Sequence, residues 1–159
     1  SREGYNRYGM IYASEAVNIS ITGSGEINGN GTYFMNGIDK PHFGGNDFNR
    51  KFIRQGEEFM KPGDVFEDGP VSYLYRPGLL FTIERCENIN ISDVILKDSP
   101  EWTMRIEDCD NVVVSRVSIL NNQLIPNSDG IHINTSRNIR ISDCNIFNSQ
   151  IITFFDIPG

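Results

Sequence analysis

The residues best suited to chemistry lie in the segment Asn127-Ser128-Asp129-Gly130-Ile131-His132. Asp129 precedes a glycine, so its carboxylate sits at a tight turn, where a catalytic site could use it to accept a proton. His132 falls on the same face as Gly130 and could contact a ligand there. Asp-Gly is also a common turn pair, and such a histidine is often a surface side chain, so both residues keep a purely structural interpretation as well.

The elements around this segment repeat. The three clearest copies are Cys86–Leu96, Cys109–Ile119 and Ser136–Ile146, and Ala16–Gly23 is a fourth. Each has a small residue, an asparagine two positions later, and then alternating isoleucine or valine. The spacing is 23 residues from Cys86 to Cys109 and 27 residues from Cys109 to Ser136. A repeat of this length indicates a solenoid, propeller or array.

Alternation with a period of two and β-branched residues predicts strands, and no segment shows a sustained helical period. We therefore predict an all-β fold, a parallel β-helix in which each rung stacks on the last. Leucine-rich repeats fit less well, because their leucine frame is absent. Asparagine tolerates left-handed turns, so the repeated asparagines are expected to stack as a hydrogen-bonded ladder inside the coil. They are Asn18, Asn88, Asn111 and Asn138.

Length and composition favour one domain over residues 1–159, interrupted by a loop-rich excursion at about 31–78. Aromatic residues in the excursion either pack back on the coil as a lid or form a wall for sugar stacking. No apolar run is long enough to cross a membrane, so no membrane partner is expected. The net charge of -7 argues against nucleic acid.

The three cysteines occupy small-residue positions of the repeat and are interpreted as packing residues. A disulfide between Cys86 and Cys109 is the minority alternative, because neighbouring rungs lie about 4.8 Å apart. No Cys-x-x-Cys or Cys/His cluster accompanies them, so no metal site is predicted. Asn-x-Ser/Thr sites occur at Asn18, Asn30, Asn90 and Asn134, but these residue types are simply frequent in such turns.

Several stretches together carry a family resemblance. They are Ile11–Ala13, Gly23–Gly29, Arg76–Leu80, Cys86–Ile89, Asp98–Thr103, Asn127–Ile131 and Ser136–Ile141. The chain resembles glycoside hydrolase family 28, the polygalacturonase family of right-handed, pectin-lyase-like parallel β-helices. Ser-Pro-x-Trp followed at this distance by Asn-x-Asp-Gly is the most specific part. The likeness covers most of residues 8–35 and 76–146, and the chain looks like an N-terminal portion or a short, divergent member.

The resemblance implies roles for named residues. Family enzymes carry an Asn-Thr-Asp motif, then Gly-Asp-Asp about one rung later, and later Gly-His-Gly and Arg-Ile-Lys. Asp129 matches the carboxylate that helps to activate water for inverting hydrolysis, and Asn127 and His132 are then interpreted as substrate contacts. Ser149-Gln150-Ile151 stands at the Gly-Asp-Asp positions, so the second carboxyl of an inverting site is missing there. Asp156 is a single carboxylate out of register.

Three functions therefore remain open. The first is a pectin-degrading glycoside hydrolase, the second a non-catalytic polysaccharide-binding β-helix, and the third a structural β-solenoid. An open rung edge could support self-association. The expected partner is a pectic polysaccharide or oligosaccharide, with no cofactor. By resemblance, the expected location is secreted, periplasmic or at the cell surface.

Overall fold

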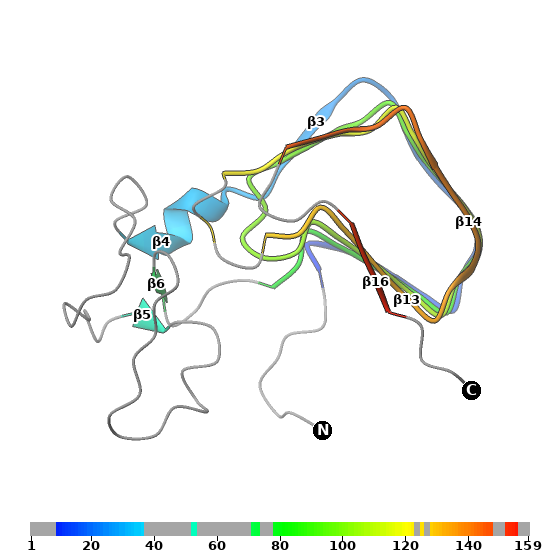
Figure 1. Ribbon diagram of the computed structural model, residues 1–159, viewed down its shortest axis with the longest axis horizontal. Coiled ribbons are helices and arrows are strands. Elements are labelled where there is room, and N and C mark those ends of the chain that lie inside the picture. The colour runs from blue at the N-terminus through cyan, green and yellow to red at the C-terminus, as the bar shows by residue number, and fades with distance from the viewer. Residues whose placement is uncertain are drawn as a thin grey trace.

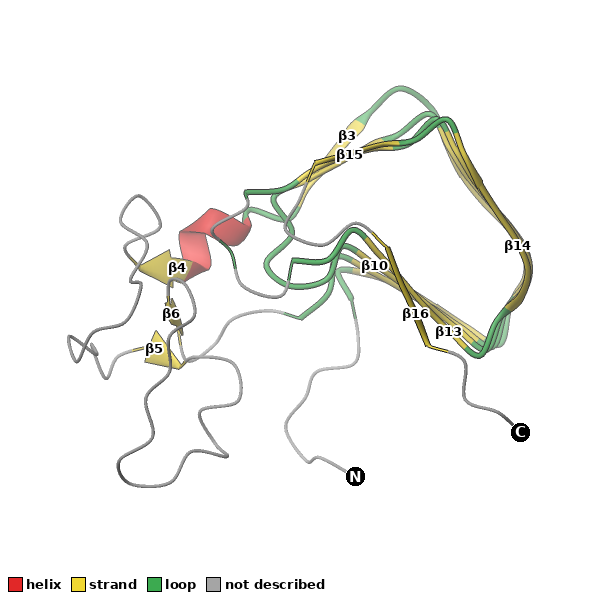
Figure 2. Ribbon diagram, in the orientation of Figure 1, coloured by secondary structure: helices red, strands yellow, loops and turns green. Residues whose placement is uncertain are grey.

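The computed structural model describes residues 9–36, 52–53, 71–73, 78–122, 125, 128–147 and 152–155. Most of the described strands wind into one coil with three flat sides, seen end-on in Figure 1 and by secondary structure in Figure 2. Each side is a parallel sheet, and we name the three sheets A, B and C in the order in which the chain visits them.

Sheet A contains β1 (Ile11–Ser14), β7 (Phe81–Glu84), β10 (Met104–Glu107), β13 (Ile131–Asn134) and β16 (Ile152–Phe155). Sheet B contains β2 (Val17–Thr22), β8 (Glu87–Ser92), β11 (Asp110–Ser115) and β14 (Arg137–Ser142). Sheet C contains β3 (Glu26–Asn28), β9 (Ile95–Lys97), β12 (Ser118–Leu120) and β15 (Asn145–Phe147). The chain thus passes once through each sheet per rung.

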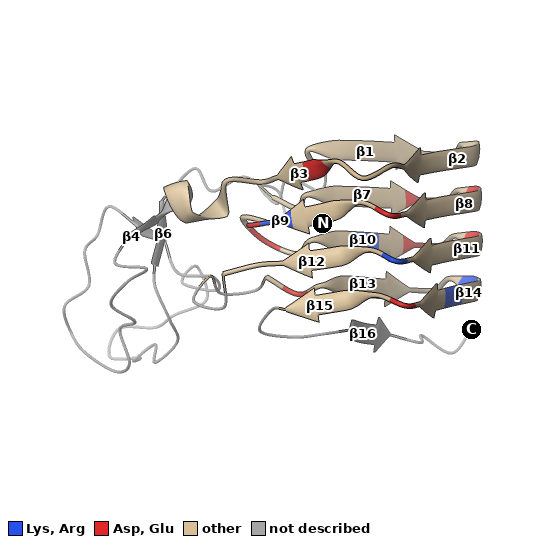
Figure 3. Cartoon of the chain, turned by 90° about the horizontal axis from the view of Figure 1, so that it is seen from above, with Lys and Arg blue, Asp and Glu red and all other residues tan. Residues whose placement is uncertain are grey.

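The coil is a right-handed parallel β-helix, as predicted. In Figure 3 the strands of each sheet lie one above another along the coil axis, as β1, β7, β10 and β13 do in sheet A. Equivalent residues of successive rungs pair with one another: Met104 pairs with Phe81 on one side and with Ile131 on the other. The parallel crossovers have the hand that a right-twisted strand imposes.

The interior is filled by the alternating apolar residues that the repeat predicted. Ile83, Ile106 and Ile133 pair in register within sheet A, and all three are buried. Sheets B and C contribute inward rows of the same kind, including Ile91 with Val114 and Leu96 with Ile119. Packing in registered rows explains why the alternation has a strict period of two.

A small element lies apart from the coil, within the segment predicted as an excursion. A 3-10 helix, Gly31–Phe34, leads into an antiparallel sheet of β4 (Met35–Asn36), β6 (Val71–Tyr73) and β5 (Phe52–Ile53). The remainder of the excursion lies outside the described residues, so the choice between an aromatic lid and a sugar-stacking wall stays open.

Left-handed residues turn the chain at the corners of each rung. Glu15, Arg85, Asp108 and Thr135 stand at the corner between sheets A and B, with φ values from 47° to 53°. Gly23, Asp93, Arg116 and Asp143 stand at the corner between sheets B and C, also with positive φ. Repeated corners of one conformation keep successive rungs superimposed.

The asparagine ladder lies on the outside of the coil, in sheet B. Asn88 donates from Nδ2 to Oδ1 of Asn18 at 3.2 Å, and Asn111 donates to Oδ1 of Asn88 at 2.7 Å. Asn138 stands at the equivalent position, but its Nδ2 donates to Oδ1 of Asp110 at 2.8 Å. Stacking is confirmed for three rungs, whereas the expectation of a ladder inside the coil is wrong. The inward positions are already filled by isoleucine and valine, and the amides are exposed.

This placement changes what Asn111→Ala should do. Asn111 has φ 56°, and an alanine in that conformation costs about 1–2 kcal/mol, whereas glycine adopts it readily. We expect Asn111→Ala to lower the free energy of unfolding by that amount and Asn111→Gly to lower it much less. Urea unfolding of the three proteins measures both values. Equal losses for alanine and glycine would show that the amide contact matters more than the backbone conformation.

All three cysteines are free thiols, and each follows the same local pattern. Cys86 donates from Sγ to the carbonyl of Glu84 at 3.2 Å, and Cys109 donates to the carbonyl of Glu107 at 3.2 Å. Cys86 and Cys109 are buried in the hydrophobic core. Their interpretation as small packing residues is therefore confirmed.

Burial gives Cys109 an effect on alkaline stability. Desolvation of the thiolate raises the pKa of Cys109 to about 11, from an ordinary value of 9.0. The unfolded chain therefore loses this proton at lower pH than the folded chain does. The contribution of the Cys109 thiol to the free energy of unfolding is fully present below pH 9 and is lost as the pH rises from 9 to about 11. That difference corresponds to roughly 2–3 kcal/mol. Denaturant melts from pH 8 to 11 should show a steeper loss for the wild type than for Cys109→Ala, and parallel curves would contradict this assignment.

Candidate active site on the outer face of sheet A

The outer face of sheet A is polar, with side chains aligned across rungs by strand register. One row contains Tyr12, Thr82, Arg105 and His132, and the next contains Ser14, Glu84, Glu107 and Asn134. The residues between these rows face the core. The predicted contact His132 therefore lies in a row of hydrogen-bonding and charged groups, adjacent to Arg105 on the neighbouring strand.

Asp129 sits at the turn that leads into β13. Its carbonyl accepts a hydrogen bond from the N–H of Thr103 at 2.8 Å, and the carbonyl of Gly130 accepts one from Met104 at 3.1 Å. These bonds fix the turn to the preceding rung. Asp129 is only 5% exposed, so it is not the solvated turn residue that the common Asp-Gly interpretation describes. A largely desolvated turn whose backbone is fixed to the preceding rung can position a carboxylate for acid–base catalysis.

His132 is also buried, with 6% of its surface exposed. The structure therefore contradicts the interpretation of His132 as a surface side chain. Loss of hydration lowers the pKa of His132, and the nearby Arg105 lowers it further, while the carboxylates of Asp129 and Glu107 raise it. Desolvation is the largest of these effects, so the imidazole is neutral at neutral pH. Asp129 and His132 are thus close enough to interact electrostatically.

Trp102 covers one face of the His132 ring. The two ring centroids lie 4.0 Å apart and the planes are inclined by 14°, which is a stacked arrangement. Trp102 comes from the turn before β10, one rung earlier than His132. Sequence reasoning used Trp102 only as part of a family motif and did not foresee this contact.

Asn121 holds the turns beneath the site together. Its Oδ1 accepts from the N–H of Ser99 at 3.0 Å. Its Nδ2 donates to Oγ1 of Thr103 at 2.5 Å and to the carbonyl of Ser128 at 3.1 Å. All four residues are buried, so one amide connects the turn before β10 to the residue that precedes Asp129. Sequence reasoning missed Asn121 because it lies outside the repeated asparagine position.

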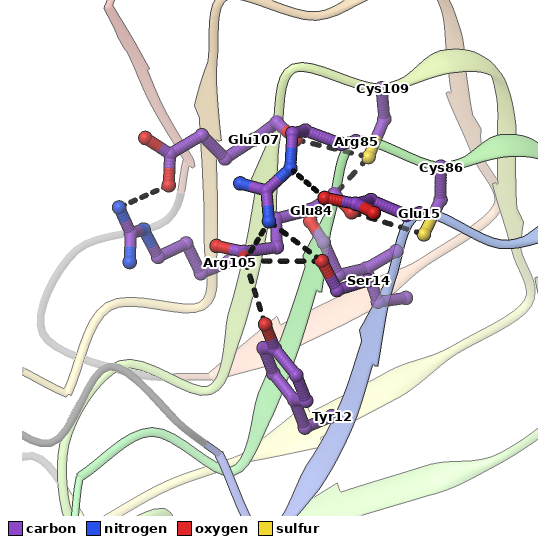
Figure 4. Close-up of polar contacts among 10 residues, drawn as sticks. Tyr12, Ser14, Glu15, Glu84, Arg85, Cys86, Arg105, Glu107 and Cys109 are labelled. Carbon is purple, nitrogen blue, oxygen red and sulfur yellow. Dashed lines mark hydrogen bonds and ion pairs between the residues drawn. The ribbon is translucent and has the colours of Figure 1, made fainter.

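A second polar cluster lies on the same face, nearer the first rung (Figure 4). Oε1 of Glu84 accepts from the hydroxyls of Tyr12 at 2.7 Å and Ser14 at 3.2 Å, and from Nη2 of Arg85 at 2.8 Å. The hydrogen bond from Tyr12 is the main influence that holds the pKa of Glu84 below its ordinary value, against the opposing effect of burial. Glu84 therefore stays ionised, and its Oε1 accepts hydrogen bonds from within the protein.

Arg105 forms an ion pair with Glu107 on its own strand, between that cluster and His132. Only 14% of the Arg105 side chain and 25% of the Glu107 side chain are exposed. The guanidinium is therefore neutralised by a neighbour, yet it lies next to His132 and lowers the pKa of that residue.

Some predicted residues cannot be placed. Asn127 lies outside the described residues, as do Gln150 and Asp156, so the role of Asn127 and the source of a second carboxyl stay predictions. Among the described residues, no group of three or more His, Cys, Asp or Glu side chains could hold a metal ion. The described part also contains no helix long and apolar enough to span a membrane.

A right-handed parallel β-helix with a buried carboxylate and imidazole at one outer face is a pectin-lyase-like scaffold with a candidate active site. Residues 74–150 match the sequence profile of glycosyl hydrolases family 28, which confirms the family resemblance over that region.

Individual proteins agree with this match. The chain is 24% identical over 138 residues to a polygalacturonase of Persea americana, which covers 87% of this chain. It is 26% identical over 125 residues to a polygalacturonase of Malus domestica, covering 79% of this chain. It is 32% identical over 62 residues to polygalacturonase-2 of Solanum lycopersicum, covering 39% of this chain. The chain spans 24%, 22% and 14% of the lengths of these three proteins.

A solved structure from Parabacteroides merdae shares the fold. The match has a TM-score of 0.54 at 20% identity and covers 92% of this chain and 61% of the other. At that identity the likeness concerns the fold alone.

Proposed function

We propose that this chain carries the water-activating half of an inverting glycoside hydrolase site for galacturonan-type pectin. In this proposal Asp129 is the general base that takes a proton from the attacking water, and Asn127 and His132 contact the sugar. The observation that carries the proposal is the buried, rigidly held Asp129 beside His132, within the region that matches glycosyl hydrolases family 28. The polygalacturonases named above support the choice of a pectic substrate.

An inverting mechanism needs two carboxyl groups about 6.5–9.5 Å apart, one as base and one as acid. Glutamine at position 150 cannot supply the acid, so the leaving oxygen would depart without an efficient proton donor. This observation favours a second candidate function, a polysaccharide-binding β-helix that uses the same face without turnover. The polygalacturonase likeness also supports a secreted or cell-wall location for either function.

Two assays separate the candidates. Retention of the chain on immobilised polygalacturonate, compared with a neutral galactan, measures binding. Reducing-end release from polygalacturonate and rhamnogalacturonan measures hydrolysis. Asp129→Asn is the test variant, and Asp143→Asn is the matched control, because Asp143 is an exposed carboxylate at another corner of the coil.

Reducing ends that accumulate linearly, that require Asp129 and that persist in Asp143→Asn would support the hydrolase. Retention without any reducing ends would support the binding module. A chain that is neither retained nor active would contradict both proposals.

A further inference from the structure

The stack of Trp102 on His132 joins two rungs at the candidate site. Trp102 belongs to the turn before β10, whereas His132 belongs to β13. The carbonyl of Trp102 accepts hydrogen bonds from the N–H of Leu80 at 3.1 Å and from Oγ of Ser99 at 3.1 Å. The backbone that carries the indole is therefore hydrogen-bonded both to the preceding rung and within its own turn. A ring held in this way restricts rotation of the imidazole that lies 4.0 Å from it.

The charged groups around His132 act in opposite directions on the protonation of its imidazole. Asp129 and Glu107 favour the imidazolium, while Arg105 and loss of hydration disfavour it. If His132 were charged, it would pair with Asp129 and reduce the ability of that carboxylate to accept a proton. A flat aromatic surface excludes water from one side of the imidazole and so contributes to the desolvation that disfavours the charged ring.

We propose that Trp102 is a positioning residue of the candidate site, which fixes the ring of His132 beside Asp129 so that the uncharged imidazole can hydrogen-bond a sugar hydroxyl. This proposal rests on the proposed function only in its last clause. Trp102 itself is assigned no contact with the sugar, so its whole effect on binding is expected to pass through His132.

The chain provides a direct spectroscopic test. Trp102 is its single tryptophan, and His42 and His132 are its two histidines. Because a protonated imidazole in contact quenches indole fluorescence, the emission should fall as His132 gains its proton, with a midpoint below the ordinary pKa of 6.5. His132→Gln should abolish the transition, and the matched control His42→Gln should retain it. A transition that follows His42 would overturn the assignment.

Ring variants test the positioning itself, with the NMR signal of the His132 Cε1–Hε1 group as the readout. Trp102→Leu removes the aromatic face, so the titration midpoint of His132 should move up towards its ordinary value. Trp102→Phe keeps a stacking ring, so the midpoint should stay near that of the wild type. An unchanged midpoint in Trp102→Leu, or equal shifts in both variants, would overturn the proposal. Thermal melts confirm that each variant is folded.

The affinity for trigalacturonate tests the positioning role of Trp102 separately from the proposed function of the site. If Trp102 acts through His132, the double variant Trp102→Leu/His132→Gln should bind no more weakly than His132→Gln alone. A further loss in the double variant would show a role that bypasses His132 and would overturn the positioning assignment. A wild-type chain that binds no trigalacturonate but shows the expected titrations would contradict the proposed function and support fixation of the ring by Trp102.

Discussion

Reducing-end release from polygalacturonate by this 159-residue chain is expected to be about 10²–10⁴-fold slower than release by a hydrolase with both carboxyl groups in place. The reason is chemical. The base half of the site has a suitable carboxylate in Asp129, but the position expected to protonate the leaving oxygen holds Gln150. A glutamine amide can donate a hydrogen bond, but it cannot transfer a proton at a useful pH.

The rate is measured with the wild type and with Asp129→Asn at equal concentration. Slow release that falls further in Asp129→Asn is the expected pattern. Fast release abolished by Asp129→Asn would show that another acid, such as Asp156, completes the site, and the predicted defect would be wrong. Fast release that is insensitive to Asp129→Asn would remove Asp129 from the mechanism.

Asn121→Ala is expected to lower the free energy of unfolding by roughly 3 kcal/mol or more. The substitution leaves the N–H of Ser99, the carbonyl of Ser128 and the hydroxyl of Thr103 without their common partner. Each such buried group costs about 1–3 kcal/mol when it loses its hydrogen bond without access to water. The cost exceeds that expected for Asn111→Ala, because the ladder asparagines are exposed.

The measurement is urea unfolding followed by circular dichroism, with Asn145→Ala as a control. Asn145 is an exposed asparagine in β15, so its loss should change stability by no more than about 0.5 kcal/mol. A cost for Asn121→Ala as small as that of the control would mean that water or a rearranged turn replaces the amide.

The fold was largely predictable because the repeat shows both where the strands lie and which strands are neighbours. Alternating isoleucine and valine after each asparagine predicted strands with one buried face, and residues such as Val112 and Val114 are fully buried as that pattern requires. The spacings from Cys86 to Cys109 and from Cys109 to Ser136 predicted which strands pair, and the observed register agrees.

The environment of individual side chains was less predictable. The ladder asparagines were expected inside the coil, but a period-two pattern assigns faces only where the backbone is extended. Each of these asparagines is the second residue of its sheet B strand and has a positive φ, which interrupts that alternation. The burial of His132 could not be predicted, because the ring that stacks on it belongs to Trp102, which lies 30 residues earlier in the sequence but one rung away in space. Asn121 was missed because its three partners come from turns, where no periodicity marks which groups will meet.

The most direct test of the central claim is an NMR titration with trigalacturonate, because the chain has a single indole N–H signal, from Trp102. If the sugar binds beside Asp129 and His132, this signal and the ring signals of His132 should shift saturably with one common dissociation constant. His132→Gln should weaken that binding, and His42→Gln should leave it unchanged. Saturable shifts elsewhere in the spectrum, with the Trp102 and His132 signals unmoved, would contradict the assignment of the site to this face of sheet A.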